Sequence, residues 1–409
     1  MNSAEPVYTN SMSRLTSPVW RKKASSTSRC SAPTLMMADP VTTEAIMATN
    51  RQSLRFGVLL AAGIFLVVPD LLGQNIGRII PTNEVVLTGY GTVGWTGRTE
   101  GDKANEFTAS VSPVFLWQFQ DRVLFEAEFE FALQEGVTET GLEYAQIDFI
   151  ASDNVVLVAG KFLLPFGIFG PELHPTWINK FPTSPPLYGH HVSEFGAEPL
   201  LPILADVGVA GQLALTSGRV RFGFNAYATN GPSTDDAGVP LPELELPASS
   251  SDNNTDKAFG GRIDFQLPPF IRVNVSGYNG DYDDQNTLDF TTWSVATVVR
   301  LAGVEIVGEY IQTRQEVEEL TGISTFKRDG LWAQASYRIG PWEPVLRWTQ
   351  IFQSDLNGVI QDEGAWQAGF GLDYWFGPSV AVMGGYEINR ERGVEIDNDR
   401  IVVHVAFGF

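Results

Sequence analysis

The sequence predicts an all-β fold, a sixteen-stranded antiparallel transmembrane β-barrel. Residues 84–409 repeat segments of about 9–16 residues in which apolar and polar side chains alternate. Very short connections alternate with longer ones between these segments. No stretch is apolar enough for a helical span, which needs about 20 residues, since the longest apolar run, residues 56–68, has 13 residues and ends at Pro69.

The apolar run at residues 56–68 has the layout of a secretory signal peptide. Arg51 and Arg55 precede it, and Leu71-Leu72-Gly73 forms a small-residue cleavage site before Gln74. We therefore expect a signal peptide over residues 47–73, starting at Met47, and a mature chain that begins near Gln74. Residues 1–46 are then an upstream extension or a miscalled start. A buried core helix is the alternative for the apolar run.

Charge and cysteine content argue against a nucleic-acid-binding protein and against a disulfide-stabilised barrel. The full chain has a net charge of −21, and residues 74–409 hold 20 Lys and Arg against 44 Asp and Glu, a net charge of −24. Such acidity argues against a nucleic-acid partner, because neutralising phosphates requires basic patches. The single cysteine, Cys30, lies ahead of residue 74, so the barrel region contains no disulfide.

Alternation is clear in residues 105–120. Phe107, Val111 and Phe115 share one face with Trp117, while the intervening positions are mostly Glu, Thr, Ser and Gln. The same reading gives sixteen expected strands: 84–96, 105–120, 122–135, 140–152, 154–162, 205–217, 219–229, 257–268, 270–280, 288–301, 303–315, 328–339, 343–353, 363–376, 378–390 and 398–409.

The connections alternate in length along the chain. One set has one to three residues, such as Asp121, Asp153 and Gly218. The other set is longer: 97–104, 136–139, 163–204, 230–256, 281–287, 316–327, 354–362 and 391–397. Short periplasmic turns alternating with longer outer loops are typical of outer-membrane barrels. A soluble β-sandwich or propeller is the alternative, but its strands usually have 5–6 residues.

Aromatic residues near the strand ends support a membrane position. Trp95, Trp117, Trp293, Trp342, Trp348, Trp366, Tyr374 and Phe376 fall on the apolar face, where interfacial girdles lie in such barrels. The last strand ends with Val403, Val405, Phe407 and Phe409 in alternate positions. This pattern resembles the terminal signal by which the barrel-assembly machinery recognises outer-membrane proteins.

The connection 163–204 contains 42 residues and is the longest. Connections longer than about 12–15 residues are usually functional, and this one is rich in proline and aromatic residues. We expect it to fold into the barrel lumen and form a pore constriction. The constriction residues would be Lys161, Glu172, His174, Lys180, His190, His191, Glu194 and Glu198. The alternative is a loop over the barrel mouth or against a neighbouring subunit.

The start of this connection resembles the phosphate-selective porin (porin O and P) family. The likeness rests on Gly160-Lys161-Phe162-Leu163-Leu164-Pro165-Phe166-Gly167. The resemblance implies a sixteen-stranded porin that takes up anions through basic residues, of which Lys161 alone can be carried over. Lys180 is the only other lysine near the constriction, and Glu172, Glu194 and Glu198 oppose phosphate selectivity.

Because alternate residues of a strand face the same side, the sequence predicts which charged residues line the lumen. Acidic residues crowd the third and fourth strands, and arginines share the polar face of later strands. The expected wall residues are Glu126, Glu128, Glu130, Asp148, Arg219, Arg221, Arg262, Arg272, Arg300, Arg338, Arg347 and Arg400. Opposed walls of opposite sign would create a field across the pore, whereas pairing across adjacent strands would cancel it.

Other chemistry has little support. Three of the four histidines, His174, His190 and His191, lie in the long connection, but their spacing matches no metal site. Aspartates 281, 283 and 284 are read as solvated loop charge and not as a Ca²⁺ site. We expect no metal, no cofactor and no catalytic residues, because His404 has no evident nucleophile as a partner.

Three function hypotheses follow. The first is a weakly selective diffusion porin for small hydrophilic solutes and ions in the bacterial outer membrane. The second is a phosphate- or other anion-selective porin, and the third is a non-transport barrel, an adhesin or an enzyme. Expected partners are outer-membrane lipid, the barrel-assembly machinery and two further copies of the chain in a homotrimer.

Overall fold

The computed structural model describes residues 85–98, 105–134, 137–189, 195–234, 241–246, 253–320 and 322–409. The predicted extension (1–46) and signal peptide (47–73) lie outside these ranges, as do His190, His191 and Glu194. Within the described part, no helix is long and apolar enough to cross a membrane.

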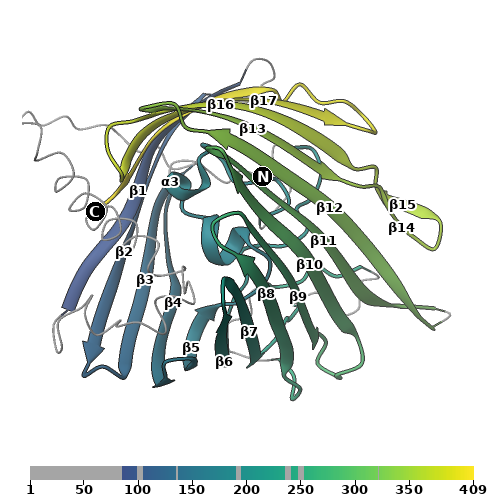
Figure 1. Ribbon diagram of the computed structural model, residues 1–409. Helices are drawn as coiled ribbons and strands as arrows, with labels where there is room; N and C mark the ends of the chain where they lie inside the picture. Colours follow the sequence, from purple (N-terminus) through teal and green to yellow (C-terminus); the bar gives the residue numbers. More distant parts are fainter. Residues whose placement is uncertain are drawn as a thin grey trace, which may run out of the picture. The chain divides into compact units, whose positions relative to one another are not determined.

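The strands form a closed antiparallel barrel, in which β1 pairs with both β2 and β18 (Figure 1). The sixteen barrel strands confirm the predicted fold class. They are β1 (Val85–Arg98), β2 (Glu106–Phe119), β3 (Val123–Gln134), β4 (Val137–Ser152), β5 (Val155–Leu163), β6 (Ala205–Ser217), β7 (Val220–Thr229), β8 (Ala258–Leu267), β9 (Ile271–Asp281), β10 (Asp289–Leu301), β11 (Val304–Glu319), β12 (Gly322–Tyr337), β13 (Trp342–Ile351), β16 (Ala365–Trp375), β17 (Val380–Glu391) and β18 (Arg400–Gly408).

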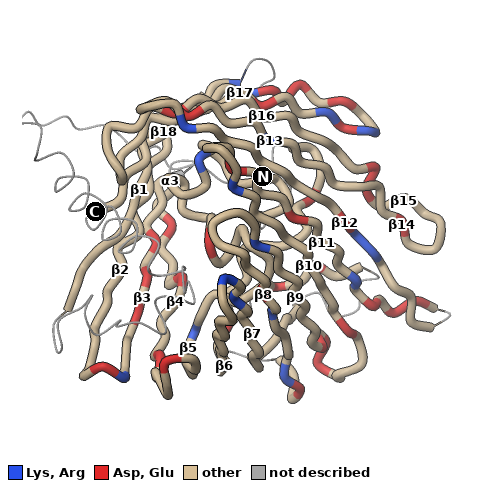
Figure 2. Tube along the Cα trace, viewed as in Figure 1, with Lys and Arg blue, Asp and Glu red and all other residues tan. Residues whose placement is uncertain are grey.

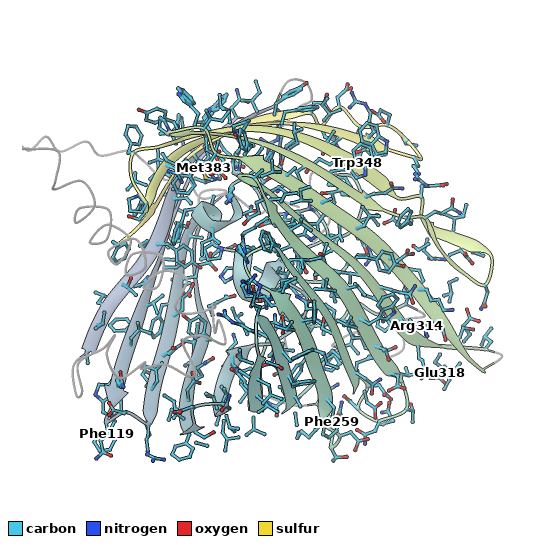
Figure 3. The ribbon with its side chains drawn as sticks, in the orientation of Figure 1. Phe119, Phe259, Arg314, Glu318, Trp348 and Met383 are labelled. Atoms are coloured by element: carbon cyan, nitrogen blue, oxygen red, sulfur yellow. The ribbon has the colours of Figure 1, made fainter. Side chains whose placement is uncertain are left out.

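Each strand separates an apolar outer face from an inner face that is largely polar. In β13, Glu343, Arg347 and Thr349 are buried inside, whereas Leu346 and Trp348 are 56% and 40% exposed outside. Figure 3 shows Phe119, Phe259 and Trp348 at the outside of the ribbon. Because water would not favour so many exposed apolar side chains, this surface fits a hydrocarbon environment.

Aromatic side chains of the outer face form contacts between neighbouring strands. Trp348 stacks on Trp366 with ring centroids 4.8 Å apart. Tyr374 meets Trp342 edge to face at 4.8 Å and Phe376 at 5.0 Å. These contacts fit the predicted aromatic girdle, because Trp and Tyr suit the boundary between lipid and water.

Two predicted connections contain more strand than expected. Strands β11 and β12 remain paired as far as Glu319 and Gly322, so most of the predicted loop 316–327 is ladder. Residues 354–362 form a small hairpin, β14 (Ser354–Leu356) and β15 (Val359–Asp362). Val317, Phe326 and Leu356 are buried together, and this apolar cluster explains why both extensions are ordered.

The third loop, predicted as residues 163–204, folds into the lumen in its described parts, 164–189 and 195–204, as predicted. It contains a π-helical turn, η3 (Phe169–Leu173), and a short helix, α3 (Thr176–Asn179), both inside the barrel in Figure 1. Its apolar side chains are buried against inward residues of β9–β12, including Tyr278, Phe290, Ile311 and Trp332. The lumen is therefore packed on this side, and a second buried cluster, which includes Val114, Leu124 and Tyr144, lies on β2–β4.

Candidate functional site: the lumen and its inner loop

The predicted motif at residues 160–167 carries the chain from β5 into the lumen. Gly167 has φ +60°, and a Cβ there would lie 1.9 Å from Oε1 of Glu309. Glycine is therefore required at position 167 for two reasons, its left-handed backbone conformation and the close approach of the Glu309 carboxylate. The Gly167 amide donates to Ser276 Oγ at 2.8 Å, and Leu164 N donates to Leu204 O at 2.9 Å, which closes the loop at its base.

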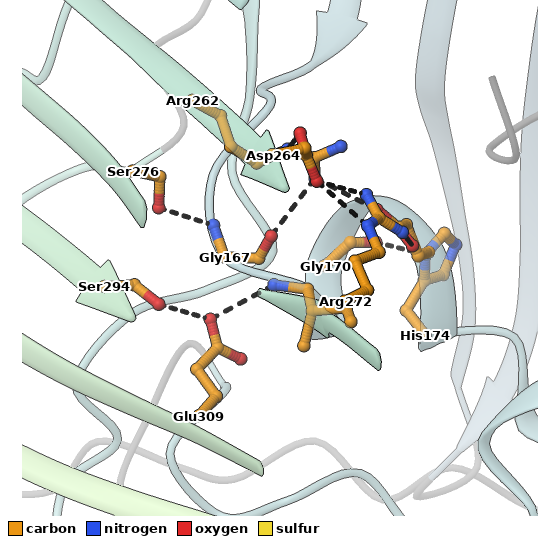
Figure 4. A network of polar contacts seen from close by, with 11 residues as sticks. Gly167, Gly170, His174, Arg262, Asp264, Arg272, Ser276, Ser294 and Glu309 are labelled. Atoms are coloured by element: carbon orange, nitrogen blue, oxygen red, sulfur yellow. Dashed lines mark hydrogen bonds and ion pairs between the residues drawn. The ribbon is translucent and has the colours of Figure 1, made fainter. Parts of the chain in front are cut away.

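Glu172 holds the π-helical turn to two arginines of the barrel wall, Arg262 and Arg272, which Figure 4 shows beside Asp264. Arg272 donates from Nη1 and Nη2 to the two Glu172 oxygens at 2.5 and 2.7 Å, and Arg262 Nη1 lies 3.1 Å away. Asp264 accepts from both arginines, through Nε of Arg262 at 2.9 Å and Nη2 of Arg272 at 2.5 Å. Two positive and two negative charges thus cancel within this network.

Glu309 fixes the next part of the loop. Its Oε1 accepts from Ser294 Oγ at 2.7 Å and Ile168 N at 3.2 Å. Its Oε2 accepts from Tyr188 Oη at 2.8 Å and Trp332 Nε1 at 3.1 Å. Burial, reinforced by the neighbouring Glu309 charge, raises the pKa of Tyr188 well above its usual value. Four donors satisfy this buried carboxylate, so we assign it an anchoring role.

Lys180 anchors the end of α3. Its Nζ lies 2.9 Å from Glu305 Oε1 and 3.0 Å from Glu343 Oε1. Burial alone would lower the pKa of Lys180, but the two carboxylates raise it above its usual value. The lysine predicted at the constriction is therefore neutralised by two wall carboxylates.

Arg347 lies in a buried network at the middle of the loop. Its Nη2 is 2.9 Å from Glu387 Oε1 and 2.6 Å from Thr183 Oγ1, and its guanidinium carbon lies 4.0 Å from the Phe181 ring centroid. Arg400 pairs with the other oxygen of Glu387. Both predicted arginines face the lumen, as expected, but one glutamate is shared between them.

Glu198 contacts the wall through its main chain. Its carbonyl oxygen accepts from Arg328 Nη2 at 2.6 Å, and Pro199 O accepts from Nη1 at 2.9 Å, whereas the Glu198 side chain is exposed. Glu198, predicted at the constriction, therefore lies beside Arg328 of the barrel wall and contacts it through the main-chain oxygen.

The remaining predicted arginines differ in position. Arg219 lies exposed in the turn between β6 and β7, so its assignment to the lumen wall was wrong. Arg221 lines a small cavity of about 90 Å³ with Arg262 and Arg272. At the turn end, Arg300 pairs with Glu305, and Arg338 lies over the Trp375 ring at 4.8 Å.

The acidic residues of β3 and β4 face the lumen as predicted, and Figure 2 shows acidic positions gathered on these strands. Glu126, Glu128 and Asp148 are buried, and Glu130 is exposed. Within the described ranges, no lysine or arginine lies within ion-pairing distance of these four carboxylates. Among the described residues, the acidic wall is thus held by hydrogen bonds from Tyr90 and Gln146 and by no ion pair, unlike the basic one.

His174 and Lys161 lie on the acidic side of the loop. His174 Nδ1 is 2.6 Å from Gly170 O, and Nε2 is 3.2 Å from Tyr90 Oη. Burial lowers the pKa of His174 to about 4, so it is neutral at pH 7. Lys161 Nζ donates to the main-chain oxygen of Leu142 at 2.7 Å and so is held at the barrel wall.

Two cavities border the segment formed by η3 and α3. The loop-end chamber, about 680 Å³, is lined by residues that include Tyr90, Glu106, Glu128, Glu130, Glu143, Lys161, His174 and His404. The turn-end chamber, about 790 Å³, is lined by residues that include Glu172, Trp177, Lys180, Arg300, Glu305, Arg338, Glu343 and Trp375. Helix α3 contributes to both linings, through Thr176 on one side and Trp177 and Ile178 on the other, so it lies between the two chambers.

Sequence reasoning missed the partners of the arginines. Asp264, Glu305, Glu309, Glu343 and Glu387 share the inner face with the predicted basic residues. The alternation that identified the inward arginines could also have identified these acidic residues. Each lies an even number of residues from an inward position of its own strand, and alternate residues of a strand face the same side. Thr183 carries no such signal, since its contacts with Arg347 and Glu387 depend on the path of the loop.

Comparison with known proteins supports the barrel assignment. A family model described as Gram-negative porin matches residues 201–393. An uncharacterised protein of Aquifex aeolicus (strain VF5) is 29% identical over 257 residues, which cover 58% of this chain. This chain thus spans about half of that relative, 54% of its length.

Solved outer-membrane proteins share the fold at low sequence identity. The channel DcaP of Acinetobacter baumannii aligns with 80% of this chain and 98% of its own, at 15% identity and a TM-score of 0.56. OmpF of Salmonella typhi covers the same shares at 14% identity and a TM-score of 0.53. OmpT of Vibrio cholerae lacking loop L8 aligns over 80% of this chain and 100% of its own, at 11% identity and a TM-score of 0.52. The chain therefore has the barrel fold of these proteins, and its residues 201–393 match the Gram-negative porin family.

Proposed function

We propose that this protein is a passive channel of the bacterial outer membrane that admits small hydrophilic solutes and ions with weak selectivity. The observation that carries the proposal is a closed sixteen-stranded barrel whose lumen holds two chambers on either side of an inner loop. The apolar outer face supports a position in lipid. The match to the Gram-negative porin family supports the outer membrane as the location.

Planar-bilayer recording tests this function directly. Purified protein should produce stepwise, ohmic currents in KCl, because diffusion through a fixed aqueous pore needs no trigger. The control is a variant with Gly167→Val, in which the new side chain would overlap Glu309 and disturb the seating of the loop. Its steps should change in size, whereas an unrelated contaminant would be unaffected. Folded protein without any conductance would contradict the proposal.

A phosphate-selective channel is the second candidate. It rests on the residue 160–167 motif and on Arg221, Arg262 and Arg272, which line one small cavity. Against it, Arg262 and Arg272 share Glu172 and Asp264 in a network without net charge. If phosphate at low concentration blocks chloride current, the second candidate is correct.

The proposed partners are surrounding lipid, the barrel-assembly machinery and two further copies of the chain. The homotrimer is supported by the many apolar residues of the outer face, part of which a neighbouring barrel could cover. Chemical cross-linking in intact outer membranes should give a trimer band. A monomer band alone would contradict this assembly.

A further inference from the structure

Phe181 of the third loop lies directly against the backbone of β16 and β17. The wall at this place consists of inward-facing glycines, Gly369 and Gly371 of β16 and Gly385 of β17. A Cβ at Gly369 would lie 2.7 Å from Phe181 Cζ, and one at Gly385 would lie 3.1 Å from Pro182 Cγ. Side chains of ordinary size at these positions would therefore hold the loop away from the wall. The contact of Phe181 with these three glycines is the Phe181 seat.

Arg347 and a set of hydrogen bonds complete the Phe181 seat. The guanidinium carbon of Arg347 lies 4.0 Å from the Phe181 ring centroid, and Phe181 is 0% exposed. Asn179 Nδ2 donates to the carbonyls of Phe181 at 3.0 Å and Thr183 at 2.7 Å. Arg347 Nη1 donates to the same Thr183 carbonyl at 2.5 Å. Packing and these donors together fix how closely the segment 181–183 lies on the wall.

The same segment also borders the loop-end chamber. Pro182 and Thr183 line this chamber, which has a volume of about 680 Å³. The position of the segment on the wall therefore decides how much of the lumen it leaves free. Carbon atoms pack at about 3.5–4.0 Å, so a side chain at position 369, starting 2.7 Å from the ring, would displace the ring by about 1 Å. Because the wall lies behind the ring, this displacement would carry Pro182 and Thr183 toward the chamber.

We propose that the Phe181 seat determines the size limit of the channel, and that Gly369, Gly371 and Gly385 are positioning residues that keep the loop-end chamber wide. The inference rests on the proposed channel function, since a size limit has meaning only for solutes that pass. The seating of the loop does not rest on that function, because it depends only on contacts of the folded barrel. It accounts for three glycines in a wall that elsewhere carries large inward residues such as Trp332 and Glu387.

The test is a steric exchange between the loop and the wall. Gly369→Val should lower the single-channel conductance in KCl at least about 1.5-fold, because the pathway narrows. It should also slow the entry of the larger sugars in a series tested by liposome swelling. Phe181→Ala added to Gly369→Val should restore both values, since the smaller loop side chain frees the space that valine occupies.

Gly384→Val is the matched control on the same part of the barrel. Gly384 is the neighbour of Gly385 on β17, and a Cβ there would meet Leu372 O at 3.7 Å, an ordinary van der Waals distance. Its pairing with Leu372, which is 50% exposed, places it on the outer face. The control variant should therefore keep the wild-type conductance and size limit. Should Gly369→Val fail to fold, Gly385→Ala is a milder change that presses on Pro182 and should also lower the conductance.

Reductive methylation of Lys180, followed by mass spectrometry, reports on the Phe181 seat without any current. Lys180 directly precedes Phe181, and its ammonium group is held by Glu305 and Glu343. Displacement of the ring in Gly369→Val should loosen these ion pairs and speed the methylation of Lys180. The added Phe181→Ala should return the rate to that of the wild-type protein.

Unchanged conductance in folded Gly369→Val, or conductance that stays low after Phe181→Ala is added, would overturn the proposal. If no protein conducts but methylation of Lys180 follows the expected order, the seat stands and the proposed channel function is contradicted. Equal methylation rates in all three proteins would overturn the seat itself.

Discussion

Buried charged residues hold the third loop in place, and Arg347 is the clearest case. The side chains of Arg347 and Glu387 are both 0% exposed, and Arg347 also donates to the Thr183 carbonyl at 2.5 Å. An isolated charge at this depth would be unstable, so each partner depends on the other. Because Thr183 belongs to the loop, the same residues connect loop position with barrel stability.

We predict that Arg347→Met lowers the free energy of unfolding by about 3 kcal/mol, since it leaves Glu387 with Arg400 as its single cation. Urea unfolding in lipid vesicles, followed by tryptophan fluorescence, measures the change. Arg314→Met is the matched control, because Arg314 is exposed and bonded to Gln312 on its own strand. Equal stability of the two variants would contradict the anchoring role.

His174 should make loop docking dependent on pH. Its pKa is about 4 when docked, against 6.5 for a free imidazole. As the pH falls below 6.5, the undocked histidine takes up a proton that the docked one does not, so docking weakens progressively until about pH 4. The difference of about 2.5 units corresponds to about 3 kcal/mol.

Channel noise and loop proteolysis at pH 7, 5.5 and 4.5 measure this effect. His174→Asn should flatten the dependence, because asparagine does not titrate. Tyr90, Glu128 and Glu143 face the same region and remain in both proteins, so the difference between the two curves isolates His174. The same pH dependence of channel noise and proteolysis in both proteins would show that His174 does not control loop docking.

At the scale of elements, the pairing of β1 with β18 closes the barrel. Gly89 and Phe409 exchange two main-chain hydrogen bonds, 3.1 Å from the Gly89 amide and 2.9 Å from the Phe409 amide, and Thr88 Oγ1 also donates to the Phe409 carbonyl. Val403 and Val405 lie exposed on the outer face of β18. The last residue thus contributes both backbone closure and an outward aromatic ring.

Deletion of Phe409 should therefore lower the yield of folded barrel more than Phe409→Ala does. The alanine variant keeps the main-chain bonds and loses only the ring. Heat-modifiable mobility on gels measures folded protein. Equal yields of the deletion and wild-type proteins would contradict the role of the terminal residue in assembly and closure.

Strands were predictable because period-2 alternation is local. The predicted ends of β6, β10 and β16 all agree with the structure to within two residues. The extra ladder of β11 and β12 was not predictable, because Val317 and Phe326 are stabilised by Leu356, which is distant in sequence. The ion pairs of Glu172 with Arg262 and Arg272 likewise depend on the loop path, since the partners are about 100 residues apart. The alternation along a strand can place a charged residue on the inner face, but it cannot show which residue of opposite charge forms an ion pair with it.

For the whole molecule, the distribution of compensated and uncompensated charge determines ion preference. The predicted arginine wall exists on later strands, but Arg262, Arg272, Arg347 and Arg400 are paired with acids. The acidic wall of β3 and β4 has no described counter-charge. We therefore expect only a weak field across the pore and a modest preference for cations over anions.

We predict that the reversal potential in a KCl gradient indicates a modest cation preference. The preference should weaken from 0.1 to 1 M salt, because the screening length falls from about 10 Å to about 3 Å. Glu172→Gln should shift the potential toward anions, since Asp264 then remains the single carboxylate between Arg262 and Arg272. Glu198→Gln, whose exposed side chain lies outside this network, should have a smaller effect. Strong anion preference in the wild-type channel would mean that solutes follow the arginine side of the loop, and the resemblance to phosphate-selective porins would then be the better guide.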